Sequence, residues 1–171
     1  MEKQKHPDII IGGLAAGLIG EARLTQDIDI LIAISQEGVG DFLKQAIKCG
    51  FTFSSRKQIV EDVDLRGVFS LKRGEFHVDF ILGNMPFEEE AFSRRQKIKL
   101  FNRTAYFPTP EDLILFKLIA SRPKDLLDIQ AIVLRHKQKL DQDYLKKWAR
   151  IISDDLDDVQ IYQKLEKLLK D

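Results

Sequence analysis

The chain is 171 residues long and 44% of its residues are hydrophobic, which is enough to bury one core and fits one globular unit better than two. It contains 27 Lys and Arg residues and 27 Asp and Glu residues, so the formal net charge is zero. This balance excludes a global electrostatic attraction to nucleic acid, to an anionic membrane or to an acidic partner, and any such attraction must be local. The one cysteine, Cys49, cannot form an internal disulfide, which suits a reducing cytoplasm.

The N-terminal region resembles a signal peptide in outline, because Lys3 and Lys5 precede the apolar, glycine-rich residues 9–22. Pro7 and Asp8 interrupt that arrangement, and removal of the region would leave the next predicted strand without its preceding partner. No apolar run reaches the ~18 residues that a transmembrane helix needs. The sequence therefore predicts a soluble, cytoplasmic protein that does not contact the membrane.

The first part of the chain alternates between short strands and short helices. The hydrophobic pattern predicts strands over residues 8–11 and 26–34, and helices over residues 14–19 and 41–48. Gly12 and Gly13 end the first strand, and Gly20 and Gly50 suit the positive φ of a helix C-terminal cap.

Two β-rich runs follow, over residues 65–72 and 75–82, and Arg73-Gly74 joins them in a predicted antiparallel hairpin. A helical turn is expected over residues 88–92. Residues 97–107 are expected to form one further extended segment.

The composition changes at Thr109, which begins a strong helix start. Threonine stands in the capping place, Pro110 is the first helical residue, and two acids follow in the first turn. Helical periodicity then predicts helices over residues 113–120, 124–136, 143–152 and 154–170.

These elements predict an α+β fold with a mixed β-sheet flanked by helices. We expect residues 1–107 to form this core and residues 108–171 to form a helical region packed on it, within one compact unit or as a second domain.

The run DIDILI places two acids, Asp27 and Asp29, among isoleucines. On a strand these acids share one face, while Ile28 and Ile30 share the other. Their side-chain origins lie roughly 6 to 7 Å apart, close enough for both carboxylates to bind one cation. Mg²⁺ is a hard cation that prefers oxygen ligands and offsets the repulsion between two ionised acids.

A third acid, Asp79, stands between Val78 and Phe80 in the run EFHVDFIL. If that strand lies next to residues 26–34, three carboxylates can hold two metal ions, the arrangement used for in-line phosphoryl or nucleotidyl transfer. By strand alternation His77 faces the same side as Asp79. A half-exposed histidine is the ordinary explanation for that residue.

The Gly12-Gly13 turn suits the approach of backbone N–H groups to phosphate oxygens at a helix N-terminus. Each feature also has an ordinary structural explanation: a common turn, the solvated face of an edge strand, and a buried ion-pair partner. The turn and the three acids together favour phosphate chemistry.

These residues resemble the signature of the DNA polymerase β-like nucleotidyltransferase superfamily, a Gly-Gly or Gly-Ser turn followed by Asp-x-Asp and a later strand acid. More narrowly, GGLAAGLIGEARLTQDIDILI and FPTPEDLILFKLIASRPKDLLDI resemble the AbiEii-like branch. That branch includes the nucleotidyltransferase toxins of bacterial toxin-antitoxin systems. The resemblance spans residues 9–134.

The resemblance implies a role for each matching residue. It assigns the triphosphate turn to Gly12 and Gly13, and both metal binding and catalysis to Asp27, Asp29 and Asp79. Asp79 is the general base by elimination.

The resemblance also implies nucleotide-binding residues outside the acid strands. Arg23 and Thr25 match the R-x-T-x-D pattern before the acid strand. Lys117 matches a helical lysine that meets the phosphates and takes part in catalysis, although a lysine among apolar residues can also extend to the surface. Asp125 and Asp128 fall in an Arg-x-x-Asp-type motif, here Arg122-Pro123-Lys124-Asp125. They can also simply complement the dipole of a helix N-terminus.

The resemblance implies a Mg²⁺-dependent transfer of a nucleoside monophosphate from an NTP to an acceptor hydroxyl, with a tRNA-like acceptor. Arg95, Lys97 and Lys99 alternate along an extended segment and can follow an RNA backbone, or can protect an edge strand from aggregation. No aromatic residue is interleaved among them. Two alternatives stay open: nucleotidyl transfer to a small molecule such as an antibiotic, and a non-catalytic nucleotide-binding protein that acts through a partner such as an antitoxin.

Overall fold

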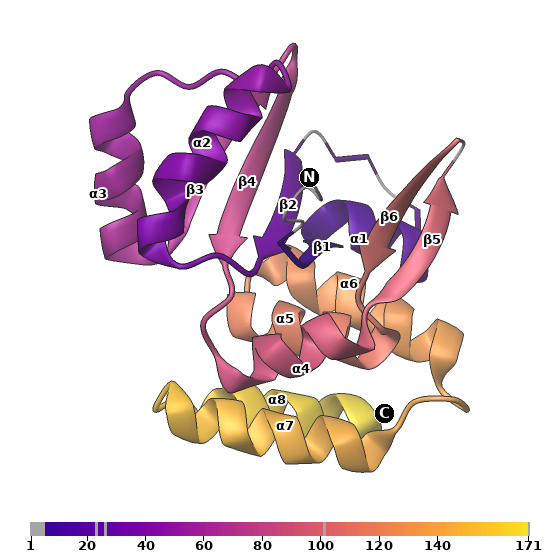
Figure 1. Cartoon of the computed structure of the whole chain (residues 1–171). Coiled ribbons are helices and arrows are strands. Elements are labelled where there is room, and N and C mark those ends of the chain that lie inside the picture. The colour runs from indigo at the N-terminus through magenta and orange to yellow at the C-terminus, as the bar shows by residue number, and fades with distance from the viewer. Residues whose placement is uncertain (1–5, 23, 26, 101, 171) are drawn as a thin grey trace.

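The computed structural model describes residues 6–22, 24–25, 27–100 and 102–170. Its main feature is a four-stranded sheet in the order β1-β2-β4-β3 (Figure 1). The strands are β1 (Asp8–Ile11), β2 (Asp27–Ile32), β3 (Val68–Arg73) and β4 (Phe76–Leu82). β2 and β4 pair in parallel and the two outer pairings are antiparallel, so the sheet is mixed. The prediction that the two acid-bearing strands lie next to each other is confirmed, because β2 pairs with β4.

One face of this sheet is covered by α2 (Val39–Lys48) and α3 (Arg56–Arg66), as Figure 1 shows. Alternate strand residues supply the apolar side of the contact. The directly paired Phe69 and Phe80 stack with their ring centroids 5.2 Å apart, and Phe42 of α2 meets both rings edge to face. This core fixes β3 and β4 in register, and therefore the position of Asp79.

The other face of the sheet carries the acids at one end and apolar residues at the other. Ile9 and Leu31 are fully buried there against Ala91 and Phe92 of α4 (Pro86–Arg94). Phe116 of α5 (Pro110–Ala120) packs against the same cluster. The acid-bearing face is therefore dry at the C-terminal end of β2, and its polar part lies at the N-terminal end.

A short helix, α1 (Gly12–Ile19), leaves β1 and packs on the helical part of the chain. That part consists of α5 (Pro110–Ala120), α6 (Pro123–His136), α7 (Gln142–Asp155) and α8 (Val159–Lys170). Ala15, Ala16 and Ile19 share one buried cluster with residues from all four of these helices. Arg135 and His136, in the last turn of α6, bond to the carbonyl groups of Gly20 and Ile19 at the end of α1.

The predicted helix start at Thr109 is confirmed, because its hydroxyl accepts a hydrogen bond from the Asp112 N–H at 3.1 Å. The single extended segment expected over residues 97–107 is wrong. Those residues form a hairpin, β5 (Gln96–Leu100) and β6 (Arg103–Phe107), which is a separate two-stranded sheet. The turn expected over residues 88–92 is part of the longer α4.

Two helix boundaries also differ from expectation. Residues 65 and 66 were expected in a strand, but they end α3, where the Ser55 hydroxyl caps the helix and Gly67 ends it with φ +64°. The helix expected over residues 154–170 begins only at Val159, since Asp157 adopts φ +50° and separates α7 from α8.

Within the described ranges, no helix has both the length and the apolar character to span a bilayer.

Candidate active site

The parallel pairing of β2 with β4 places Asp29 directly opposite Asp79, and Asp27 opposite His77. Directly paired residues project to the same face of a sheet, so these four side chains share one face. Asp29 and Asp79 are half-buried and Asp27 is exposed at the start of its strand. The Ser70 hydroxyl, on the neighbouring β3, donates a hydrogen bond to Asp79 Oδ1. The structure therefore brings two of the predicted acids side by side.

The glycine turn lies against the carboxylate of Asp29. Gly12 has φ +68°, and a Cβ added there would lie 1.7 Å from Asp29 Oδ2. The backbone N–H of Gly13 donates a hydrogen bond to the same carboxylate. Position 12 thus requires glycine for two reasons, its left-handed backbone and the absence of space for a side chain.

The environment of Asp29 opposes its negative charge. Burial raises the pKa of this carboxyl, and the neighbouring charge of Asp79 raises it further. Arg122, the Gly13 N–H and Lys117 act in the opposite direction without cancelling the rise. Two adjacent carboxylates with only partial compensation are a site where a divalent cation would be stabilised.

The donor chemistry here fits Mg²⁺, because the acids present only oxygen atoms to a common face. Among the residues that the structure describes, no three His, Cys, Asp or Glu side chains are grouped closely enough to hold a metal ion. The metal-binding roles of Asp27, Asp29 and Asp79 accordingly stay predictions.

A buried ion cluster faces these acids from α5 and α6. The ammonium of Lys117 donates to Asp125 Oδ1 at 2.9 Å and to Asp128 Oδ2 at 2.6 Å. Lys117 is 2% exposed, so the alternative that it extends to the surface is wrong. Asp125 is fully buried and Asp128 is nearly so. Together these three residues form a compact group with a formal charge of −1, since one cation faces two anions.

Arg122 adds the second positive charge to this cluster. Its guanidinium bonds Asp125 twice, Nε to Oδ2 at 2.7 Å and an Nη to Oδ1 at 3.2 Å, and its backbone N–H is capped by the same carboxylate at 3.1 Å. Burial works to raise the pKa of Asp125, but the bonds from Arg122 and Lys117 outweigh it and lower the pKa. The Asp125 hydrogen bond raises the pKa of Arg122. Asp125 therefore stays ionised and holds both cations.

A hollow of about 400 Å³ separates the acids from the cations. Asp29 and Gly12 lie on one wall, and Lys117 and Arg122 lie on another. The remaining lining is largely apolar and comes from Ile11, Leu31, Ile81, Phe116 and Ile119, with Ala120 and Glu88. The exposed Arg122 guanidinium and the N-terminus of α1 face this space from different sides, so it can accept a phosphate chain.

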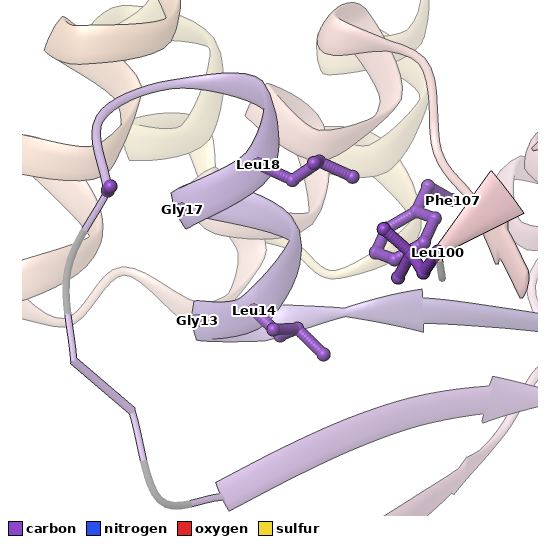
Figure 2. A pocket seen from close by; sticks show the side chains of 7 residues that line it. Gly13, Leu14, Gly17, Leu18, Leu100 and Phe107 are labelled. Carbon is purple, nitrogen blue, oxygen red and sulfur yellow. The ribbon is translucent and has the colours of Figure 1, made fainter. Parts of the chain in front are cut away.

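A second hollow, of about 260 Å³, lies on the other side of the glycine turn. Figure 2 shows Leu14 and Leu18 of α1 extending toward Leu100 and Phe107 of the β5–β6 hairpin. Gly13 and Gly17 form part of its floor. The described residues that line this hollow are all apolar, whereas charged side chains also line the first.

Three residues with predicted nucleotide roles do not line either hollow. Thr25 is exposed, and its hydroxyl donates to the carbonyl oxygen of Asp27 at 3.2 Å, which orders the start of β2. Asp125 and Asp128 lie behind Lys117. Arg23 lies outside the described residues.

Arg122 is the functional candidate that sequence reasoning missed as an individual residue. Its side chain is 50% exposed at the hollow, whereas Lys117 is enclosed by its two acids. The signal in the sequence is its place before Pro123 and three residues before Asp125, the spacing of a helix start closed by a carboxylate. Sequence patterns do not show that this helix begins beside β2.

The arrangement of sheet and helices also occurs in a solved structure. The chain is similar in fold to the crystal structure of an antigenic nucleotidyltransferase-like protein from Paracoccidioides brasiliensis, with a TM-score of 0.50. The similarity covers 94% of this chain and 84% of that one, at 14% sequence identity, and at that identity it concerns the fold alone.

The chain belongs to the family described as nucleotidyltransferase of unknown function, DUF6036, whose match spans residues 1–169. No curated protein matches it. The expected superfamily is confirmed at the level of a nucleotidyltransferase, and the AbiEii-like branch stays a prediction.

Proposed function

We propose that this protein transfers a nucleoside monophosphate from an NTP to an acceptor hydroxyl and releases pyrophosphate. The observation that carries the proposal is the pairing of Asp29 with Asp79 beside the Gly12 turn, across a hollow from Lys117 and Arg122. Membership of a nucleotidyltransferase family supports the same reaction class.

In this proposal the acids bind the metal ion, while the glycine turn beside them and Arg122 on the other wall bind the phosphates. Asp29, Asp79 and Asp27 would hold Mg²⁺ through their carboxylate oxygens. When bound there, Mg²⁺ supplies positive charge to the phosphates and orients them for in-line displacement. The N-terminus of α1, through N–H groups other than that of Gly13, and the Arg122 guanidinium would bind the outer phosphates.

The transfer itself forms one bond and breaks another. The acceptor oxygen attacks the α-phosphorus, and the bond from that phosphorus to the bridging oxygen of pyrophosphate breaks. Asp79 would take the proton of the acceptor hydroxyl as general base, with the Ser70 hydroxyl orienting its second oxygen. Lys117 is a positioning residue here, because its two aspartates occupy the ammonium.

We further propose, from the AbiEii-like resemblance, that the acceptor is tRNA-like, that the protein acts in the cytoplasm and that an antitoxin regulates it. A transfer to a small hydroxylated molecule uses the same groups and is the alternative outcome of the test below.

A transfer assay tests the reaction. The protein is incubated with each α-labelled NTP, Mg²⁺ and bulk tRNA, and label in RNA and released pyrophosphate are both measured. We expect product with wild type and a loss of at least about 100-fold in Asp29→Asn and Asp79→Asn, since each removes a charge that acts on the reacting phosphate. Asp64→Asn, an exposed acid on α3 across the sheet, serves as the matched control and should keep full activity. Product that persists in both site variants contradicts the proposal.

A further inference from the structure

The outward face of the β5–β6 hairpin combines positive charge with an aromatic ring. In the antiparallel register Lys97 pairs with Tyr106 and Lys99 pairs with Thr104, so these four side chains share one face. The opposite face carries Ile98, Leu100 and Ala105, which pack on the buried helical cluster. Lys97, Lys99 and Thr104 are exposed and Tyr106 is half-buried. We call this set, together with Arg95, the hairpin face.

Arg95 extends the hairpin face at its base. Its guanidinium lies over the Tyr106 ring, 4.8 Å from the ring centroid. One Nη donates to the carbonyl of Phe92, while Nε is buried and has no hydrogen-bond partner among the described residues. Because that Nε is buried, Arg95 contributes to the hairpin face through its charge over the ring and not through this donor.

The positive charge of the hairpin face is not neutralised locally. Among the ion pairs formed by the residues that the structure describes, none involves Arg95, Lys97 or Lys99. The formal net charge of the chain is zero, so these three cations create a local region of positive potential. The aromatic ring that appeared to be lacking in the sequence comes from the partner strand.

The hairpin is anchored to the candidate active site through α1. Leu100 and Phe107 line the apolar hollow with Leu14 and Leu18 of α1 (Figure 2). Gly12, at the start of α1, lies against Asp29. β6 also lies beside β1, and the hairpin stands on the opposite side of the molecule from α2 and α3 (Figure 1). A nucleic acid bound on the hairpin face would therefore lie on a hairpin that contacts α1, the helix that begins at the glycine turn.

We propose that the hairpin face binds a single-stranded nucleic acid, with its phosphates on Lys97 and Lys99 and one base stacked on the Arg95–Tyr106 pair. This inference rests on the proposed function in one respect, that the bound strand supplies the acceptor hydroxyl. A single strand is favoured over a duplex because its bases are free to stack on an aromatic ring.

Fluorescence anisotropy with a labelled single-stranded RNA tests the inference without any chemistry. We expect the double variant Lys97→Glu, Lys99→Glu to raise Kd at least about 10-fold and to reduce the slope of log Kd against log salt by about 1.4, the value for two lost phosphate contacts. Tyr106→Ala should raise Kd about 5-fold or more, and Tyr106→Phe, which keeps the ring, should not. Lys48→Glu, Lys57→Glu is the matched control on α2 and α3 and should stay within about twofold of wild type, since only screened, distant charges change there.

Two results would overturn the inference: equal Kd values for the hairpin variant and the control variant, or a duplex RNA of the same length that binds as tightly as the single strand. Circular dichroism of each variant shows that the fold is kept. Asp29→Asn should bind RNA like wild type. If the protein binds RNA but transfers no nucleotide, only the proposed function is contradicted. If it transfers nucleotide to a small molecule but does not bind RNA, only the proposal of RNA binding on the hairpin face is contradicted.

Discussion

At the residue scale, Gly12 is the position with least freedom in the candidate site. Both its left-handed backbone and the contact of Asp29 Oδ2 exclude a side chain. The Gly-Gly pair was visible in the sequence as a turn for phosphates. That the turn also holds a carboxylate was not visible, because the contact joins residues from two different elements.

Gly12→Ala should displace the Asp29 carboxylate and abolish transfer, with a loss of at least about 100-fold. Gly40→Ala is the control, since that glycine lies in α2 with no atom within 4 Å of an added Cβ. The control should be neutral or slightly stabilising, by up to about 1 kcal/mol. Transfer rates and urea midpoints measure both effects, and an active Gly12→Ala variant would show that the turn tolerates a side chain.

Asp29 should limit the stability of the protein when no cation is bound. Its folded-state pKa is raised above the ordinary 3.8, so its ionisation costs stability as the pH rises from 3.8 through the folded-state pKa. Asp29→Asn should therefore melt at a higher temperature than wild type at pH 7, and the difference should vanish below pH 3.8. Added Mg²⁺ should raise the melting temperature of wild type and not of the variant. A variant that is less stable than wild type at pH 7 would contradict the raised pKa.

Lys117→Met should destabilise the protein strongly, because it leaves Asp125 and Asp128 buried with less compensation. Removal of one partner of a buried pair costs about 3 to 5 kcal/mol. The triple change Lys117→Met, Asp125→Leu, Asp128→Leu should cost less than the sum of its parts. Urea unfolding measures all of these variants, and a single change that costs under about 1 kcal/mol would mean that the cluster is not coupled.

At the element scale, helix ends that carry a local capping signal were predictable, whereas breaks without a glycine were not. Thr109-Pro110 and the glycine after α2 carry local signals for a helix start and end. α3 contains only Ile59 and Val63 as buried residues, so its apolar pattern was too thin to predict it. The turn between β5 and β6 lacks a glycine, and residues 97–107 were therefore interpreted as one continuous segment. The break between α7 and α8 also lacks a glycine, and it was expected before residue 154 instead of at Asp157.

Asp112 joins three elements, and a single hydroxyl tests that connection. This fully buried acid accepts hydrogen bonds from Tyr144 of α7 at 2.6 Å, from Thr109 at 2.8 Å and from Arg94 of α4 at 3.3 Å. Tyr144→Phe keeps the ring under the Arg94 guanidinium and removes only the hydroxyl, so it should cost about 1 to 3 kcal/mol in unfolding free energy. Tyr162→Phe, whose hydroxyl bonds the exposed Arg150 and a glutamate, should cost less. Equal costs for the two would indicate that Asp112 does not connect the helices.

At the scale of the whole molecule, the candidate site is assembled from β2, β4, α1, α5 and α6. The sequence allowed prediction of the α+β class and of the residue types on each element. It did not show which elements meet, since strand order and helix packing depend on contacts between distant segments. For the same reason, the sequence did not predict that Tyr106 lies beside Lys97, or that two aspartates enclose Lys117.

We propose that Asp29 and Asp79 together bind the Mg²⁺ that carries the phosphates of a nucleotide. Calorimetric titration with non-hydrolysable analogues of the four NTPs measures this binding. We predict binding of at least one analogue that requires Mg²⁺, that is lost in Asp29→Asn and in Asp79→Asn, and that is unchanged in Asp64→Asn. Binding that does not depend on Mg²⁺, or that survives in both site variants, would contradict joint metal binding by Asp29 and Asp79.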